Sequence, residues 1–150
     1  MDTLAFNELA LVCAPAVHAS TSHALVRVES SFNPIAIGVV GGVLDRQPRN
    51  QAEAMATARQ LGTTGWNFSV GLAQINVRNF ERLGLTTASA FDACRNLRAM
   101  QTVLVECFDR AGPGTPPQTA VRQALSCYYS GNAVTGFKHG YVQKVVSAAR

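Results

Sequence analysis

Long apolar runs, clustered basic residues and internal repeats are all missing from this sequence of 150 residues. The longest apolar run, Leu9 to Val17, contains Pro15 and is far shorter than the ~20 residues that a membrane-spanning helix needs. We therefore expect no membrane span. The 13 Lys and Arg residues give a net charge of +4 but are scattered, whereas a nucleic-acid groove needs basic residues in clusters. We therefore expect no nucleic-acid partner.

Charged residues are few, at 15% of the sequence, while hydrophobic residues make up 47%. This balance argues against disorder, and no linker or low-complexity segment divides the chain. We expect residues 1–150 to form a single domain. The residues before the apolar run include Asp2 and Glu8 but no Lys or Arg, so the positive start of a secretory signal peptide is missing. We expect the leader peptide to be absent from this sequence.

Four cysteines are present, and none has zinc-ligand spacing with another Cys or with His. We expect no metal and no cofactor. An even number of cysteines fits two disulfides and an oxidising compartment; four buried free thiols are the alternative. Cys94 and Cys107 are expected in one helix, ~20 Å apart, too far for a bond that needs Cα atoms within ~7 Å. Two pairings remain possible: Cys13–Cys94 with Cys107–Cys127, or Cys13–Cys107 with Cys94–Cys127.

Apolar periodicity and capping residues predict a mostly helical chain with a small β element, which is an α+β class, mostly α. Ile35 to Leu44 is β-branched and broken by glycines, which favours a short strand or ribbon, and residues 66–70 are expected to be extended. Helices are expected at 4–14, from 21 or 22 to about 31, and at 51–61, 77–83, 93–110, 118–129 and 139–149. The expected caps are Thr3, Ser20 or Thr21, Asn50, Asn76 and Asp92.

Glu29 stands out among the nine acidic residues, because its helical neighbours three and four residues back are Val26 and Leu25. A carboxyl beside an apolar stripe loses solvation, which raises its pKa and keeps a proton available near neutral pH. A general acid requires this property. On spacing alone, a carboxylate at the rim of a helix is the alternative.

Two further side chains are candidates for a polar site. Gln74 lies in Gly71-Leu72-Ala73-Gln74-Ile75-Asn76, and its amide can both donate to and accept from sugar hydroxyl and acetamido groups. Tyr128 lies on a buried stripe, where its hydroxyl needs a partner, and a carboxyl group would serve. The alternatives are a satisfied amide at a helix start and an ordinary core tyrosine.

The motifs Glu29-Ser-Ser-Phe-Asn-Pro34, Gly71-Leu-Ala-Gln-Ile-Asn76 and a Tyr-rich segment ending in glycine occur in this order. In this order they resemble the lysozyme-like lytic transglycosylases, and most closely those of bacterial type IV secretion systems. The shared runs extend over nearly the whole chain, at residues 33–42, 65–69, 127–132 and 141–146.

The resemblance implies a lysozyme-like fold with a helical body, a small sheet and a substrate groove between them. It implies Glu29 as the catalytic carboxyl and Ser30, Gln74, Asn76 and Tyr128 as substrate-binding positions, with Ser30 and Gln74 either supporting the acid or contacting sugar. This chain carries Tyr129 where many relatives have asparagine, so the contact made there is open. The resemblance also suggests the pairing Cys13–Cys94 with Cys107–Cys127.

The resemblance implies cleavage of the MurNAc-β-1,4-GlcNAc bond of peptidoglycan in the periplasm, with 1,6-anhydro ends, beside other secretion-system components. One alternative is a hydrolytic lysozyme with Asp45 as second carboxylate. Another is a non-catalytic peptidoglycan-binding scaffold module. The transglycosylase hypothesis predicts that Glu29→Gln abolishes cell-wall clearing with little change in glycan binding or melting temperature.

Overall fold

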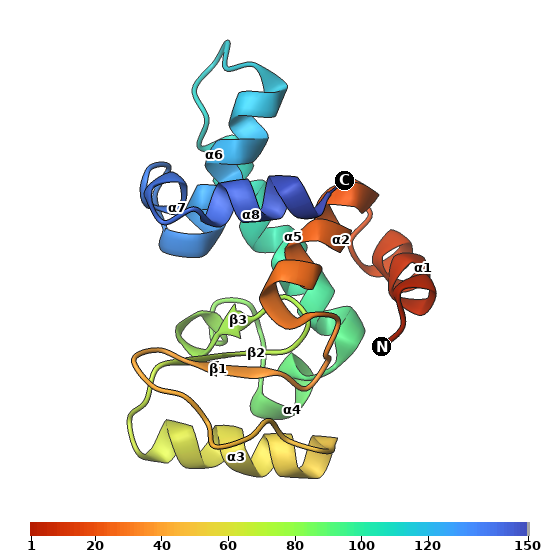
Figure 1. Ribbon diagram of the computed structural model, residues 1–150, viewed down its shortest axis with the longest axis vertical. Coiled ribbons are helices and arrows are strands. Elements are labelled where there is room, and N and C mark those ends of the chain that lie inside the picture. Colours follow the sequence, from red (N-terminus) through yellow and green to blue (C-terminus); the bar gives the residue numbers. More distant parts are fainter. Residues whose placement is uncertain (150) are drawn as a thin grey trace.

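The chain forms a helical body with a small antiparallel sheet at one end (Figure 1). The structure is a computed structural model that describes residues 1–149. The sheet has the order β1-β2-β3, with strands β1 (Ile37–Val39), β2 (Phe68–Val70) and β3 (Ile75–Asn76). The helices are α1 (Thr3–Cys13), α2 (Ala19–Ser30), α3 (Gln51–Thr63), α4 (Thr87–Ala90), α5 (Ala93–Asp109), α6 (Pro117–Ser130), α7 (Thr135–Lys138) and α8 (Tyr141–Ala148), with a short 3-10 helix η1 (Val77–Asn79). The expected α+β class, mostly α, is confirmed.

Two helix starts lie where their capping residues predict. The Asp92 carboxylate accepts from the backbone N–H of Arg95 at 2.9 Å at the start of α5, and the Asn50 side chain accepts from that of Glu53 at 2.9 Å at the start of α3. Each cap gives a partner to an N–H group that the helix itself leaves unpaired.

Other boundaries differ from the sequence-based expectation. Asp2, not Thr3, caps α1, and His18, not Ser20 or Thr21, caps α2 through its ring nitrogen. Both helices begin one to three residues earlier than expected, so the residues expected to cap them are already helical. A histidine ring nitrogen can accept in the same way as a hydroxyl oxygen, which is why His18 serves.

The short elements were the least predictable. Only η1 follows Asn76, where a longer helix was expected, and α4 was not expected at all. The last expected helix begins at Tyr141 rather than at residue 139, directly after Gly140 with φ of +76°, and the short helix α7 before it was not expected. Helices of one or two turns have little intrinsic stability, so tertiary packing rather than local sequence decides where they form.

The long helix α5 runs through the centre of the molecule, between α1 on one side and α6 on the other (Figure 1). Leu97 and Met100 of α5 are fully buried and belong to a hydrophobic cluster that also includes Phe6 of α1, Leu25 of α2 and Val70 of β2. One continuous core therefore joins the helical body to the sheet.

The structure pairs Cys13 with Cys94 and Cys107 with Cys127, which confirms the pairing that the family resemblance suggested. The first disulfide ties α1 to α5 across 81 residues of chain, and the second ties α5 to α6 across 20. In the chain-entropy description, closing loops of these lengths stabilises the fold by roughly 3–5 kcal/mol each. Both ends of α5 are thus held to neighbouring helices.

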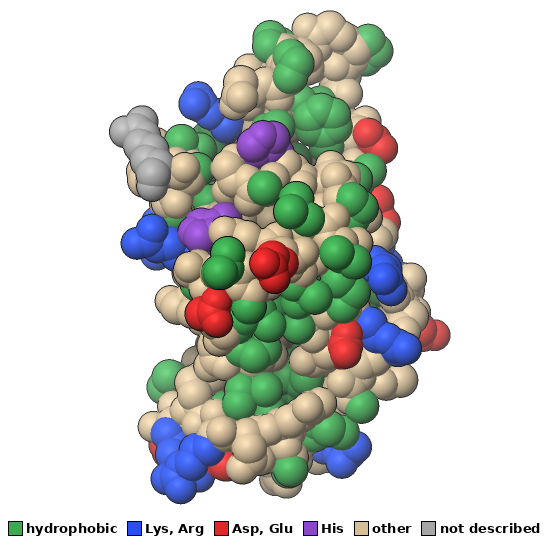
Figure 2. All heavy atoms as spheres, turned by 90° about the vertical axis from the view of Figure 1, so that its right-hand side faces the viewer, with side chains coloured by type: hydrophobic (Ala, Val, Ile, Leu, Met, Phe, Trp, Pro, Cys, Tyr) green, Lys and Arg blue, Asp and Glu red, His purple; other side chains and the backbone are tan. Residues whose placement is uncertain are grey.

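Among the described residues, none of the helices has both the length and the apolar character needed for a bilayer crossing. On the face drawn in Figure 2, Lys and Arg side chains lie in separate places rather than in one patch.

Candidate functional site

A cleft of about 840 Å³ lies between the sheet and the helices α5 and α6. One wall comes from the three strands and η1, and the other from the C-terminal halves of α5 and α6. Glu29, at the C-terminal end of α2, is among its lining residues. The others are Gly38, Val39, Val40, Ser69, Gln74, Ile75, Asn76, Asn79, Arg82, Val103, Glu106, Cys107, Arg110, Cys127, Tyr128, Tyr129 and Gly131.

Glu29 occupies the last turn of α2, whose residues Leu25 and Val26 are buried in the core. The core therefore fixes the orientation of this turn, and the helix ends directly after it because Ser31 takes a left-handed conformation with φ of 50°. Burial raises the pKa of the Glu29 carboxyl from 4.5 to about 7, although a hydrogen bond from Tyr141 acts in the opposite direction. A carboxyl with this pKa is half protonated near neutral pH, as a general acid requires.

The Tyr141 hydroxyl donates to Oε2 of Glu29 at 2.9 Å. Tyr141 is buried at the start of α8, and burial, followed by the charge of Glu29, raises the pKa of its hydroxyl. It therefore remains a donor over the whole physiological pH range. Sequence reasoning missed this contact, since 112 residues separate the partners. The available signal was the apolar spacing of Tyr141, Val142 and Val145, which marks a buried helix face.

Tyr128 does not bond to a carboxyl group, so that part of the sequence-based expectation is wrong. Its hydroxyl donates to the backbone carbonyl of Ala73 at 2.6 Å. Tyr128 nevertheless lines the cleft, and burial, followed by the negative charge of Glu29, raises its pKa well above the usual value. Tyr128 is therefore close to the acid, while its hydroxyl joins α6 to the turn between β2 and β3.

That turn, residues 71–74, is held from behind by the buried side chain of Asn96. Its amide nitrogen donates to the carbonyls of Val70 at 3.0 Å and Ala90 at 2.9 Å, and its oxygen accepts from the N–H of Ala73 at 2.8 Å. Gly71 has φ of +81°, and a Cβ there would stand 2.2 Å from the Asn96 amide nitrogen. Only glycine fits, for both conformational and steric reasons. Asn96 was not anticipated, because helical spacing gives no sign that a buried polar residue serves a distant turn.

Ser30 joins the acid-bearing helix to the same turn. Its hydroxyl donates to the carbonyl of Leu72 at 2.7 Å and to that of Val26 at 3.3 Å. Ser30 is not among the residues that line the cleft. Of the two roles that the resemblance implied, this contact favours support of Glu29 over contact with sugar.

Gln74 and Asn76 both line the cleft. The Gln74 amide nitrogen donates to the carbonyls of Ala36 and Gly71, each at 3.1 Å, which leaves its oxygen as the group available to a ligand. That oxygen lies over Gly38, where an added Cβ would approach it to 2.7 Å. The Asn76 oxygen caps η1 through the N–H of Arg78, and its nitrogen donates to the Ser69 hydroxyl at 3.2 Å.

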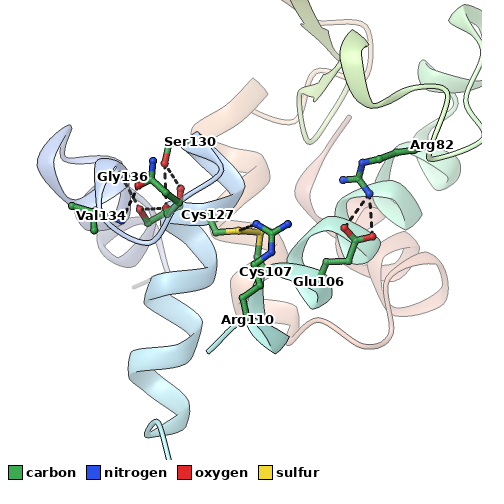
Figure 3. The surroundings of a disulfide bond; sticks show 10 residues. Arg82, Glu106, Cys107, Arg110, Cys127, Ser130, Val134 and Gly136 are labelled. Atoms are coloured by element: carbon green, nitrogen blue, oxygen red, sulfur yellow. Dashed lines mark hydrogen bonds and ion pairs between the residues drawn. A yellow bond between two sulfur atoms is a disulfide. The ribbon is translucent and has the colours of Figure 1, made fainter. Parts of the chain in front are cut away.

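The lining of the cleft also includes charges of both signs, which lie near a disulfide (Figure 3). One guanidinium nitrogen of Arg82 donates to both oxygens of Glu106, at 3.1 and 3.0 Å. Arg110 donates to the sulfur of Cys127, whose disulfide to Cys107 holds α5 against α6 at this point. The disulfide therefore stabilises the wall that carries Tyr128.

Glu29 and Glu106 are the carboxylates among the described residues that line the cleft. Glu106 is held in the ion pair with Arg82. Asp45 lies exposed in the loop between β1 and α3 and lines no part of the cleft. Within residues 1–149, no group of three or more His, Cys, Asp or Glu side chains is placed to hold a metal ion.

Comparison with known proteins identifies a family. The model of the transglycosylase SLT domain matches residues 9–147. The chain is 50% identical to "Type IV secretion system protein virB1" of Brucella suis biovar 1, over 96% of this chain and 63% of that protein. It is 38% identical to "Protein virB1" of Rhizobium radiobacter, over 100% of this chain and 63% of that protein. It is 37% identical to "Protein virB1" of Agrobacterium fabrum, over 97% of this chain and 59% of that protein.

The chain thus spans less than two thirds of the length of these relatives. No solved structure matches it.

Proposed function

The chain belongs to the transglycosylase SLT domain family, and we propose that it is a lytic transglycosylase that cleaves the MurNAc-β-1,4-GlcNAc bond of peptidoglycan. The observation that carries the proposal is the half-buried Glu29 carboxyl in the cleft, with its pKa raised to about 7. No other carboxyl of the described cleft is free of an ion pair. In the proposed mechanism one acid performs both proton transfers.

In the first step Glu29 donates its proton to the glycosidic oxygen as the bond to the anomeric carbon breaks. Burial favours the protonated form before this step. The positive charge that develops on the muramoyl ring is stabilised by the N-acetyl group of the substrate itself, as in other substrate-assisted glycosidases.

In the second step the ionised Glu29 takes the proton of the 6-hydroxyl group, and that oxygen closes onto the anomeric carbon. The product is a 1,6-anhydromuramoyl end, and no water is consumed. Tyr141 donates to the same carboxyl at 2.9 Å and so stabilises its ionised form between the two steps. A pKa near the operating pH suits a group that first donates and then accepts a proton.

The remaining site residues divide between support and recognition. Ser30 and Tyr128 donate to backbone carbonyls of the 71–74 turn, so we assign them to positioning of Glu29 and of the cleft wall. Gln74 and Asn76 present amide groups in the cleft and suit hydroxyl and acetamido groups of the sugar.

Relatives that carry the name of a type IV secretion system protein support a cellular role. We propose that this chain opens the cell wall locally for assembly of such a system, in the periplasm and beside other components of it. The two disulfides fit an oxidising compartment. The continuous hydrophobic cluster from α1 to α8 supports a single domain over residues 1–150.

The hydrolytic alternative with Asp45 loses its basis, because this residue lines no part of the cleft. Digestion of purified peptidoglycan followed by mass analysis tests the proposal. Wild type should release muropeptides with anhydro ends, which are one water lighter than hydrolysis products. Glu29→Gln should release none, whereas Glu81→Gln, at an exposed helix-flanking position, should match wild type. Muropeptides without anhydro ends, or full cleavage by Glu29→Gln, would refute the assignment.

A further inference from the structure

Tyr129 presents an aromatic ring in the cleft that the proposed chemistry does not use. It is the next-to-last residue of α6, lines the same cleft as Glu29 and remains 45% exposed. Tyr141 is buried and Tyr128 is half-buried, and both direct their hydroxyls to protein acceptors. An exposed aromatic ring inside a polar cleft is available to a ligand.

The Tyr129 ring is held in place by Tyr141 and His139. Its ring stacks on that of Tyr141 with centroids 4.6 Å apart and an interplanar angle of 20°. Its hydroxyl forms a hydrogen bond of 2.9 Å with Nδ1 of His139, whose ring also packs against it edge-on at 5.7 Å. Tyr141 therefore covers one face of the ring and His139 fixes the hydroxyl, which leaves the other face as the one that a ligand can reach. A ligand that stacks on this face needs little ordering of the side chain, which favours binding.

A flat, fixed aromatic face suits one chemical class of ligand in particular, the pyranose ring. In β-1,4-linked N-acetylhexosamines the chair form places axial C–H groups on each face of the ring, and these carry a small positive charge. The aromatic face is the negative part of the ring quadrupole and attracts such groups. The hydroxyl and acetamido groups around the edge of the sugar remain free to bond to polar groups of the cleft.

We propose that Tyr129 is a sugar-stacking residue that binds a pyranose ring of the glycan strand in the cleft of Glu29. It occupies the position where many lysozyme-like lytic transglycosylases carry asparagine, so this chain replaces an amide contact by an aromatic one. Tyr129 and Glu29 line the same cleft, so a sugar on this face belongs to the glycan strand on which Glu29 acts. The inference rests on the proposed function in that it names how the same substrate is held.

Binding is measured in the Glu29→Gln background, so that no cleavage occurs, with the β-1,4-linked N-acetylglucosamine tetramer as the probe in isothermal titration calorimetry. Tyr129→Leu removes the aromatic face and should raise the dissociation constant roughly three- to tenfold, the range for one aromatic stacking contact. Tyr129→Phe keeps the face and the stack on Tyr141, and should remain within about twofold of the parent.

Phe137→Leu is the matched control. Phe137 is 46% exposed, lies in the nearby helix α7 and lines no part of the cleft. The same loss of an aromatic ring at this position should leave the dissociation constant unchanged. An equal effect of the two leucine variants, or an unchanged constant in Tyr129→Leu, overturns the proposal. So does the absence of measurable binding by the parent at millimolar probe.

A purely structural role, in which Tyr129 only supports Tyr141, gives a different pattern. With Glu29 intact, loss of a sugar contact should raise KM on peptidoglycan and leave the pH dependence of kcat unchanged. A shifted pH dependence with an unchanged dissociation constant would show that Tyr129 acts through Tyr141 and would overturn the proposal. Failure of wild type to cleave would refute the proposed function alone, because the binding measurement does not depend on cleavage.

Discussion

Replacing Glu29 with glutamine should stabilise the fold at pH 8 and have little effect on its stability at pH 4. The carboxyl is partly buried, and the loss of solvation raises its pKa from 4.5 to about 7 on folding. The folded chain therefore binds the proton more tightly than the unfolded chain does. The stability that this proton contributes is fully present below pH 4.5 and is lost as the pH rises through about 7.

The magnitude follows from the two pKa values. A change from 4.5 to about 7 corresponds to about 3 kcal/mol, because each pKa unit equals ~1.36 kcal/mol. Glutamine is neutral at every pH and its oxygen can still accept from Tyr141, so it removes this cost without losing the hydrogen bond. For a domain of this size ~1 kcal/mol moves the melting temperature by roughly 2–4 °C. The increase in melting temperature of Glu29→Gln over wild type should therefore be about 6–12 °C larger at pH 8 than at pH 4.

Thermal unfolding of wild type and Glu29→Gln at the two pH values measures this difference, with the disulfides kept oxidised. Glu81→Gln is the matched control, because it makes the same chemical change at an exposed carboxyl outside the cleft. It reports the part of the pH effect that any such substitution produces. The sequence alone predicted little change in the melting temperature of Glu29→Gln. Because the carboxyl loses solvation on folding, we now expect this to hold only at acidic pH.

Two results would contradict the reasoning. If Glu29→Gln changed the melting temperature equally at pH 4 and pH 8, the carboxyl would not be desolvated in the folded chain. If the variant were less stable at pH 8, the ionised carboxylate would be stabilised by its surroundings. A carboxyl of that kind would be a poor proton donor at neutral pH.

Three further substitutions test the surroundings of the acid. Tyr141→Phe removes the hydrogen bond that lowers the pKa of Glu29, so the fall in kcat/KM at alkaline pH should move upward by about one unit; an unchanged pH profile would contradict this role. Ser30→Ala should lower the free energy of unfolding, measured by denaturant titration, by about 1–2 kcal/mol and should also reduce cleavage of peptidoglycan. Ser31→Ala, at an exposed hydroxyl with a bond of only 3.5 Å, should change neither quantity. Gly71→Ala should prevent accumulation of folded protein, because φ is +81° and the added Cβ would stand 2.2 Å from a buried amide nitrogen; native-like circular dichroism with an intact melting transition would refute this.

Local sequence signals predicted those parts of the fold that local interactions determine. Asp92 and Asn50 cap their helices as expected, because a cap bonds to a backbone N–H only three residues away. The burial of Glu29 follows in the same way from apolar neighbours one helical turn back. These interactions join residues three or four positions apart, so the spacing of residue types in the sequence predicts them.

The partners of Glu29 could not be predicted in this way. Tyr141 reaches the carboxyl across 112 residues, and Tyr128 reaches Ala73 across 55. Periodicity placed Tyr128 on a buried helix face, but it carries no information on what that face meets. Asn96 is the clearest case, since its side chain completes the turn at residues 71–74 from a different helix. Such contacts appear only when the elements are packed together.

The position of the carboxylates explains why one acid can suffice in this cleft. Glu106 is neutralised by Arg82, and Asp45 lies outside the cleft, so neither is free to act as nucleophile or base beside Glu29. A solvated glutamate would be ionised at neutral pH and could not donate, whereas one buried without a partner would hold its proton and could not take another. Burial opposed by the Tyr141 hydroxyl sets the pKa between these extremes, at about 7. Both protonation states are then accessible at the same pH, as a cycle of donation followed by acceptance requires.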